Sequence, residues 1–169
     1  MGQSFTFKLL EDDTYCVTSY EGDANPVIPE VYRGAPVTII ADDVFKGRAD
    51  ITSVTIPDSV TDIGSFVFDG CFALKSVTLP DNLQNMWQYA FARSGIEQIV
   101  IPDGVRNIVP FTFFRCPTLR RVVMSKSVTT IYSNAFKDCP NLTEVIVARD
   151  CKIHELAFDG CPKTPFLYI

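Results

Sequence analysis

The sequence predicts a repeat solenoid in which each unit contributes one strand to a parallel β-sheet. Short apolar segments recur along the 169-residue chain, at 53–57, 76–80, 98–102, 121–125 and 144–148. The last residues of these segments lie 23, 22, 23 and 23 positions apart. A period of about 20 to 30 residues with one strand per unit is typical of solenoids, in which each repeat contacts only its neighbours. With 47% hydrophobic residues, the chain can also form a continuous core.

One complete unit shows which elements follow one another. Residues 54–56 alternate between apolar and polar side chains, the pattern of a half-buried strand. Residues 57–59 then turn the chain, because proline ends a ladder and aspartate accepts hydrogen bonds from nearby amides. Residues 66–71 predict one tight helical turn that places Phe68 and Cys71 inward.

Equivalent apolar positions of successive units form columns that we expect to stack in the core. The columns are Ile40, Ile63, Met86, Ile108, Ile131 and Ile153; Phe45, Phe68, Phe91, Phe113, Phe136 and Phe158; and Val54, Val77, Ile99, Val122 and Val145. Neighbouring strands lie about 4.8 Å apart, so the members of each column are within contact distance. Burial of one such side chain contributes about 1.5–3 kcal/mol, so we expect single units to be unstable and the stack to be cooperative.

Residues 131–142 and their counterparts in the other units resemble the BspA-type leucine-rich repeats of bacterial surface proteins. Residues 7–23 are similar to the N-terminal hairpin that caps such stacks. The resemblance implies an α/β fold: a right-handed leucine-rich-repeat solenoid with a parallel concave β-sheet, short helical turns on the opposite side and an N-terminal β-hairpin cap. It also implies roles in adhesion or protein binding, and no catalytic residues.

We expect a single domain over residues 1–169, with the capping hairpin at 1–27 and about six repeats at 28–169. The net charge is −5 without any basic stripe, so nucleic-acid binding is not expected. No apolar run approaches the roughly 18 residues of a membrane span, and the N-terminus lacks a signal peptide. We therefore expect part of a larger cell-surface or secreted protein, or alternatively a cytoplasmic protein.

Four cysteines occupy one inward position of the repeat: Cys71, Cys116, Cys139 and Cys161. The third unit lacks this cysteine and one further residue. We expect free thiols that behave as small core side chains, although neighbouring members could also form a disulfide. His154 is the only histidine and falls at an outward position, so neither a catalytic centre nor a metal site is expected. No cofactor is expected either.

Aromatic residues on the outside of the units form the first candidate binding surface. Phe66, Tyr89 and Phe111 stand two positions before the phenylalanine column, and Trp87 and Tyr132 occupy a neighbouring outward column. A contiguous apolar patch on a soluble protein often marks a binding surface. The alternative is that the rings tuck against neighbouring repeats and stabilise the turns.

The outward column of the concave strands is the second candidate. It becomes apolar at Val100, Val123 and Ile146, continues to Tyr168, and is flanked by Arg121. Repeat proteins commonly bind partners on the concave surface. The alternative is that β-branched residues stand there because they fit a pleated sheet.

The favoured function is therefore a non-catalytic binding or adhesion module that contacts a host or cell-surface protein. The alternative is a structural spacer, or a segment that associates with its own copies through the C-terminal edge at 166–169.

Overall fold

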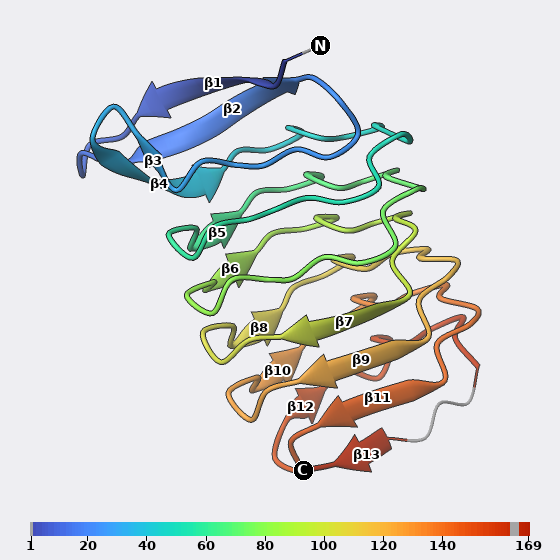
Figure 1. The fold of residues 1–169 in the computed structure, drawn as a ribbon. Helices are drawn as coiled ribbons and strands as arrows, with labels where there is room; N and C mark the ends of the chain where they lie inside the picture. Colours follow the sequence, from blue (N-terminus) through green and yellow to red (C-terminus); the bar gives the residue numbers. More distant parts are fainter. Residues whose placement is uncertain (1, 163–165) are drawn as a thin grey trace.

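The structure, a computed structural model, describes residues 2–162 and 166–169. The chain winds into stacked coils (Figure 1), and each coil has three sides. The long-strand side contains the apolar segments of the repeat, and the short-strand side contains the pairs of residues around the isoleucine column. The turn edge closes each coil and consists of residues 43–48, 66–71, 89–94, 111–116, 134–139 and 156–161.

An N-terminal hairpin covers the first coil, as expected. Strands β1 (Ser4–Leu9) and β2 (Tyr15–Glu21) pair antiparallel, and β2 also pairs in parallel with β4 (Ala35–Ile40). The two-residue strand β3 (Val31–Tyr32) pairs antiparallel with β4. The Tyr20 ring lies 5.5 Å from the Phe45 ring, so the hairpin extends the phenylalanine column at its N-terminal end.

The short-strand side consists of two-residue parallel strands. Strand β4 pairs with β5 (Asp62–Ile63), which pairs with β6 (Asn85–Met86). A second sheet contains β8 (Asn107–Ile108), β10 (Thr130–Ile131) and β12 (Lys152–Ile153). The register pairs Ile40, Ile63 and Met86 in the first sheet and Ile108, Ile131 and Ile153 in the second, as the predicted isoleucine column requires.

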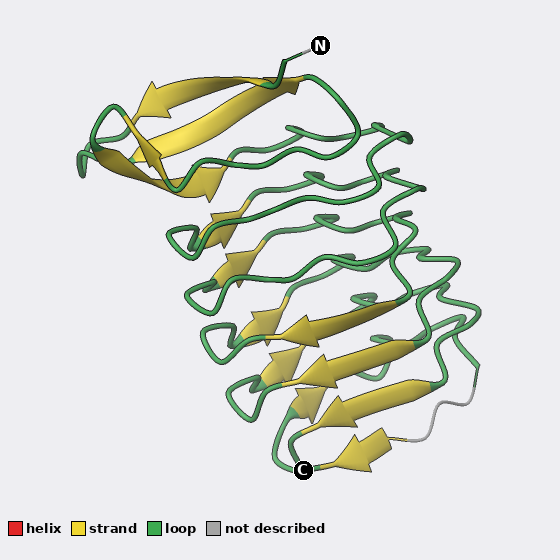
Figure 2. Ribbon diagram, viewed as in Figure 1, coloured by secondary structure: helices red, strands yellow, loops and turns green. Residues whose placement is uncertain are grey.

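On the long-strand side, a parallel sheet forms only in the C-terminal half. Its order is β7 (Gln98–Ile101), β9 (Arg121–Met124), β11 (Glu144–Val147) and β13 (Phe166–Tyr168). The strands predicted at 53–57 and 76–80 are absent. Only Thr55 forms a bridge, with Val27, and residues 76–80 belong to no strand (Figure 2).

The prediction of short helical turns is wrong, because residues 2–162 and 166–169 contain no helix. Residues 66–71 form consecutive hydrogen-bonded turns instead. The backbone at Phe66 (φ 61°) and Gly70 (φ 76°) is left-handed, which interrupts any helix. The amides of Phe66, Phe68 and Gly70 donate to carbonyls of the next coil, at 3.2, 2.7 and 2.9 Å, so they are unavailable for bonds within a helix.

The phenylalanine column is the centre of the core, as predicted. Rings from Phe45 to Phe158 stack coil upon coil, with centroid separations between 4.9 and 5.5 Å. All members except Phe158, which is half-buried, are fully buried. Cooperativity between coils follows, since each ring contacts the rings of both neighbours.

One junction between coils is weaker than the others. In the described part of the chain, no ladder joins β6 to β8 or residues 76–79 to β7. The turn edge still crosses this junction, since the Phe91 amide donates to the Thr112 carbonyl at 2.9 Å. The coils also remain close at Gly104, where an added Cβ would lie only 2.2 Å from the Leu83 carbonyl oxygen. The junction adjoins the unit with the shortened turn.

Candidate functional site

The aromatic residues Phe66, Tyr89 and Phe111 form a three-ring stack at the corner between the short-strand side and the turn edge. Their ring centroids lie 4.8 and 4.9 Å apart and the ring planes differ by 4° and 1°. All three side chains are half-buried, and the Phe114 ring meets Tyr89 and Phe111 edge-on. The Lys46 ammonium lies 4.4 Å from the Phe66 ring, a cation–π contact that covers one end of the stack. A partner would reach only the outer parts of these rings.

The backbone at this stack is left-handed, with φ between 60° and 64°. Asp43 and Asn134 occupy the same position in other coils, with φ of 64° and 60°. Asparagine and aspartate tolerate this conformation better than aromatic residues do. The three rings therefore occupy a backbone position that favours a small polar side chain.

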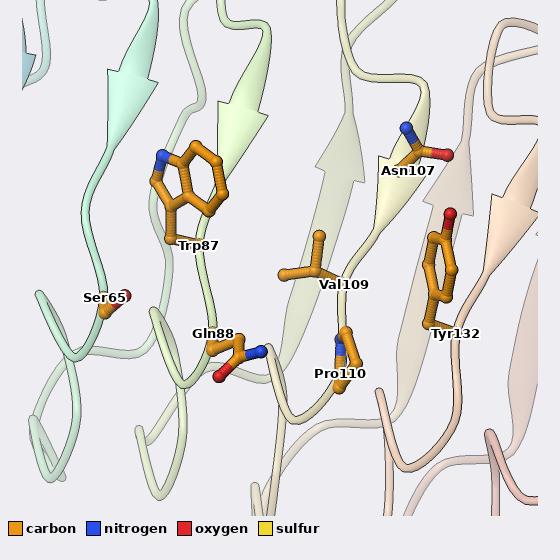
Figure 3. A pocket seen from close by; sticks show the side chains of 7 residues that line it. All are labelled: Ser65, Trp87, Gln88, Asn107, Val109, Pro110 and Tyr132. Carbon is orange, nitrogen blue, oxygen red and sulfur yellow. The ribbon is translucent and has the colours of Figure 1, made fainter.

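A groove lies beside this stack, on the short-strand side (Figure 3). Trp87 and Tyr132 form its two walls, and Val109 lies between them on the intermediate coil. The cavity measures about 250 Å³, and its remaining lining residues are Ser65, Gln88, Asn107 and Pro110. Trp87 is 49% exposed and Tyr132 43% exposed, so both predicted residues are open to a partner.

Sequence reasoning missed the polar and proline residues of this groove. Asn107 stands two positions before Val109, so the alternation of strand β8 places both on the outer face. That alternation was the signal that could have found it. Gln88 and Pro110 directly follow Trp87 and Val109, which share one outward column, and carried no separate signal.

The second predicted surface lies on the long-strand side. Strand register places Val100, Val123, Ile146 and Leu167 side by side, and we call these four residues the aliphatic strip. Leu167, not the predicted Tyr168, continues the column, because Tyr168 pairs with Val147. Val100 is 62% exposed and Leu167 50% exposed, while Val123 and Ile146 are half-buried.

Charged residues flank the N-terminal ends of these strands. The Arg121 Nε donates to Glu144 Oε1 at 2.8 Å, so Arg121 is paired along the rim of the strip. A depression of about 400 Å³ adjoins it, lined by Lys75, Ser76, Glu97, Gln98, Arg120 and Arg121. The aliphatic strip thus has an apolar centre with a polar rim at one end.

The cysteine column donates hydrogen bonds from coil to coil. The thiols of Cys71, Cys116, Cys139 and Cys161 donate to carbonyls of the preceding coil at 3.2, 3.1, 3.0 and 3.0 Å. All described cysteines are free, so the alternative of a disulfide is not observed among them. Burial raises the pKa of Cys71 to about 12, which keeps this thiol protonated at neutral pH.

His154 lies at the surface, as predicted, and its Nδ1 accepts a hydrogen bond from the Leu156 amide at 3.1 Å. Across residues 2–162 and 166–169, no group of three or more His, Cys, Asp or Glu side chains could hold a metal ion. The same ranges contain no helix of the length and apolarity that a membrane span needs.

Comparison with known protein families decides the identity of the repeat. The family model described as "BspA type Leucine rich repeat region" matches residues 38–164 in 6 copies. The chain belongs to the BspA-type leucine-rich repeat family. A comparison with curated protein sequences gives no match.

Solved structures of several bacterial proteins resemble this chain. A leucine-rich repeat protein of Treponema pallidum is 30% identical with a TM-score of 0.80, over 96% of this chain and 82% of that one. A leucine-rich cell surface protein of Faecalibacterium prausnitzii is also 30% identical, with a TM-score of 0.69 over 96% of this chain. This chain spans 52% of the Faecalibacterium protein. The pneumococcal vaccine antigen PcpA, 20% identical with a TM-score of 0.74, shares the fold over 93% of this chain and 45% of that one.

Proposed function

We propose that this chain is a non-catalytic protein-binding module of a bacterial cell-surface or exported protein, and that it contributes to adhesion. The observation that carries the proposal is the aliphatic strip, a row of outward apolar side chains from Val100 to Leu167. An exposed row of this kind, rimmed by charged residues, has the composition of a protein interface.

The rigid parallel sheet beneath the strip favours such a role. Val122 and Val145, which alternate with the strip residues, are fully buried and fix the strands from below. Binding would therefore cost little ordering of the backbone. The polar rim, where Arg121 pairs with Glu144, would contribute orientation more than affinity.

The surface location of the Faecalibacterium relative supports placement of this chain in a surface protein. Both relatives at 30% identity carry leucine-rich repeats, which commonly serve as binding scaffolds. A protein partner of a host or a neighbouring cell is the corresponding expectation.

The test is binding of the purified chain to a panel of extracellular-matrix and cell-surface proteins. A V123S/I146S variant should lose binding by about tenfold or more, because it interrupts the apolar centre of the strip. The matched control is L9S/V31S, since Leu9 and Val31 are each 55% exposed and lie away from the strip. Binding is compared at a temperature well below both melting midpoints, because V123S/I146S removes half-buried side chains and should unfold at a lower temperature than the parent chain.

Three outcomes would contradict the proposal. Equal loss in both variants would indicate non-specific apolar adsorption. Unchanged binding in the strip variant would place the partner elsewhere. Association of the chain only with itself would favour the structural spacer.

A further inference from the structure

The cysteine column brings two thiols side by side near its C-terminal end. Cys139 and Cys161 occupy the same position in neighbouring coils, and each donates to the carbonyl of the column phenylalanine one coil earlier, at 3.0 Å. Because both side chains make the same bond, they point in the same direction. The two thiols also interact with each other. The aliphatic strip involves neither thiol, so their proximity is a separate property of the fold.

The coils that carry this pair are held at a regular spacing. The Asp138 amide, directly before Cys139, donates to the Asp159 carbonyl at 2.8 Å. The Phe136 and Phe158 rings, three residues before the two cysteines, stack at 4.9 Å. Strands β10 and β12 also pair between these coils. The Cα atoms of disulfide-bonded cysteines lie roughly 4.4–6.8 Å apart, so the contacts at this junction place the pair within bridging range.

The two thiols differ in their access to solvent. Cys139 is fully buried, whereas Cys161 is half-buried in the last turn of the turn edge, where a small oxidant can reach it. Hydrogen bonding by the Cys139 thiol lowers the pKa of Cys161, because it stabilises the thiolate. Hydrogen bonding with the thiols on either side, together with burial, raises the pKa of Cys139. The thiolate is the nucleophilic form of cysteine, so Cys161 is the thiol that reacts first.

We propose that Cys161 and Cys139 form an oxidation site, at which hydrogen peroxide links the last two turns of the turn edge through a disulfide. The Cys161 thiolate attacks one peroxide oxygen, the O–O bond breaks, and the other oxygen leaves as hydroxide and takes up a proton to form water. Cys161 is then a sulfenic acid. The Cys139 sulfur attacks the Cys161 sulfur, the S–S bond forms, and the hydroxyl group leaves as water with the Cys139 proton. The two sulfurs lose two electrons, which reduce one peroxide to two waters.

The rest of the column explains why the bridge forms at this step and not at another. Cys71 and Cys116 are fully buried, so an oxidant does not reach the thiols farther along the column. Cys151 is half-buried but stands outside the column, and burial raises its pKa. Ser94 occupies the column position in the third coil, with its hydroxyl 3.7 Å from the Cys116 sulfur. The column therefore accepts serine in place of cysteine.

The test is titration of the purified, fully reduced chain with hydrogen peroxide, followed by thiol counting and mass spectrometry without reductant. We expect two of the six thiols to disappear, the mass of the monomer to fall by about 2 Da, and one peptide pair to be joined through Cys139 and Cys161. Dithiothreitol should restore all six thiols. The outcome does not depend on any partner, so the site goes beyond the proposed function and can fail without it.

Serine variants separate the roles of the two thiols. Cys139→Ser should stop at the sulfenic acid of Cys161, which dimedone traps, because no resolving thiol remains. Cys161→Ser should keep Cys139 reduced, since no accessible thiolate starts the reaction. Cys151→Ser is the matched control, because it removes a half-buried cysteine outside the column and should form the bridge as the parent does. Thermal unfolding of the reduced variants checks that each one is folded.

Retention of all six thiols at peroxide concentrations that oxidise free cysteine would overturn the proposal. A bridge between Cys116 and Cys139, or preferential oxidation of Cys151, would do so too. Conversion of Cys161 to a sulfinic acid in the parent chain, with Cys139 still reduced, would also overturn it, because Cys139 would then not act as the resolving thiol.

Discussion

The turn edge and the long-strand side hold the same coils together by different means. From residue 43 to residue 159 the turn edge carries backbone hydrogen bonds from each coil to the next, with stacked phenylalanine rings beneath them. The long-strand side has a ladder only from β7 onward, and residues 76–79 lack one on either flank in the described structure. The segments with the clearest strand pattern are thus not the ones that join every coil.

The difference shows that apolar alternation specifies burial but not pairing. Residues 76–79 alternate as 121–124 do, yet only the latter form a strand. The turn edge, which the sequence predicts as helical, provides the continuous connection. The predictions below test this comparison, from the largest expected effect to the smallest.

Amide hydrogen exchange should differ most between the two long-strand segments. The amides of Val77, Thr78 and Leu79 should exchange at least about a hundredfold faster than those of Val122, Val123 and Met124, because the latter lie within a paired strand. Residue-resolved exchange measured by NMR provides the comparison. Equal protection of the two segments would show that a ladder forms at 76–79 after all.

Phe91→Ala should destabilise the chain by about 3–5 kcal/mol. Phe91 is fully buried and stacks on Phe68 at 5.0 Å and on Phe113 at 5.5 Å, across the junction where both ladders are missing. Urea unfolding measures the free energy. The control Phe72→Ala, at a 56% exposed position, should change it by less than about 0.5 kcal/mol. A loss below about 1 kcal/mol in Phe91→Ala would refute a dominant role for the ring column.

Arg93→Met should cost about 1–3 kcal/mol. Asp69 is 1% exposed, and its Oδ1 accepts from Arg93 Nε at 2.9 Å, so the variant leaves a buried carboxylate without its donor. The half-exposed guanidinium is screened by solvent, which reduces the expected loss. Lys46→Met removes the exposed pair with Asp43 and the exposed cation–π contact with Phe66, and should cost only about 0–1 kcal/mol. Equal losses in the two variants would contradict the argument from burial.

Tyr89→Asn should have the smallest effect, a loss of about 0–1 kcal/mol. It removes two ring stacks, worth about 0.5–1.5 kcal/mol each, but relieves a left-handed backbone at φ 60°. Tyr89→Ala removes the stacks without that relief and should be less stable than Tyr89→Asn. Thermal unfolding compares the two. If Tyr89→Ala proves the more stable, backbone strain at this position is not significant.

The repeat period and the core columns could be predicted from the sequence because burial repeats with the coil. Ile63, Met86 and Ile131 are buried in the expected register. The turn edge could not be predicted in the same way, because periodicity of three residues is common to helices and to consecutive turns. Asp43 and Asn134 hinted at a left-handed backbone, but the aromatic residues at the same position in the intervening coils concealed it.

The candidate site was only partly predictable for a related reason. Trp87 and Tyr132 stand out as exposed aromatic residues in a repeated column, and the structure places both beside one groove. Gln88 and Asn107 are ordinary surface residues in the sequence, and only the geometry brings them to the same cavity. No pattern pointed to Gln88, whereas the alternation of strand β8 could have pointed to Asn107.

The junction between the coils of β6 and β8 also has a mechanical consequence. A solenoid pulled along its axis yields where the fewest bonds act in parallel. Here, in the described chain, the load passes through the turn edge, at contacts such as Arg93 N to Phe114 O at 2.8 Å, and through the bonds from Gly95 N to Cys71 O and from Glu97 N to Lys75 O, each 3.0 Å long. Under stretching force the molecule should part first at this seam, into an N-terminal and a C-terminal block, before either block unravels.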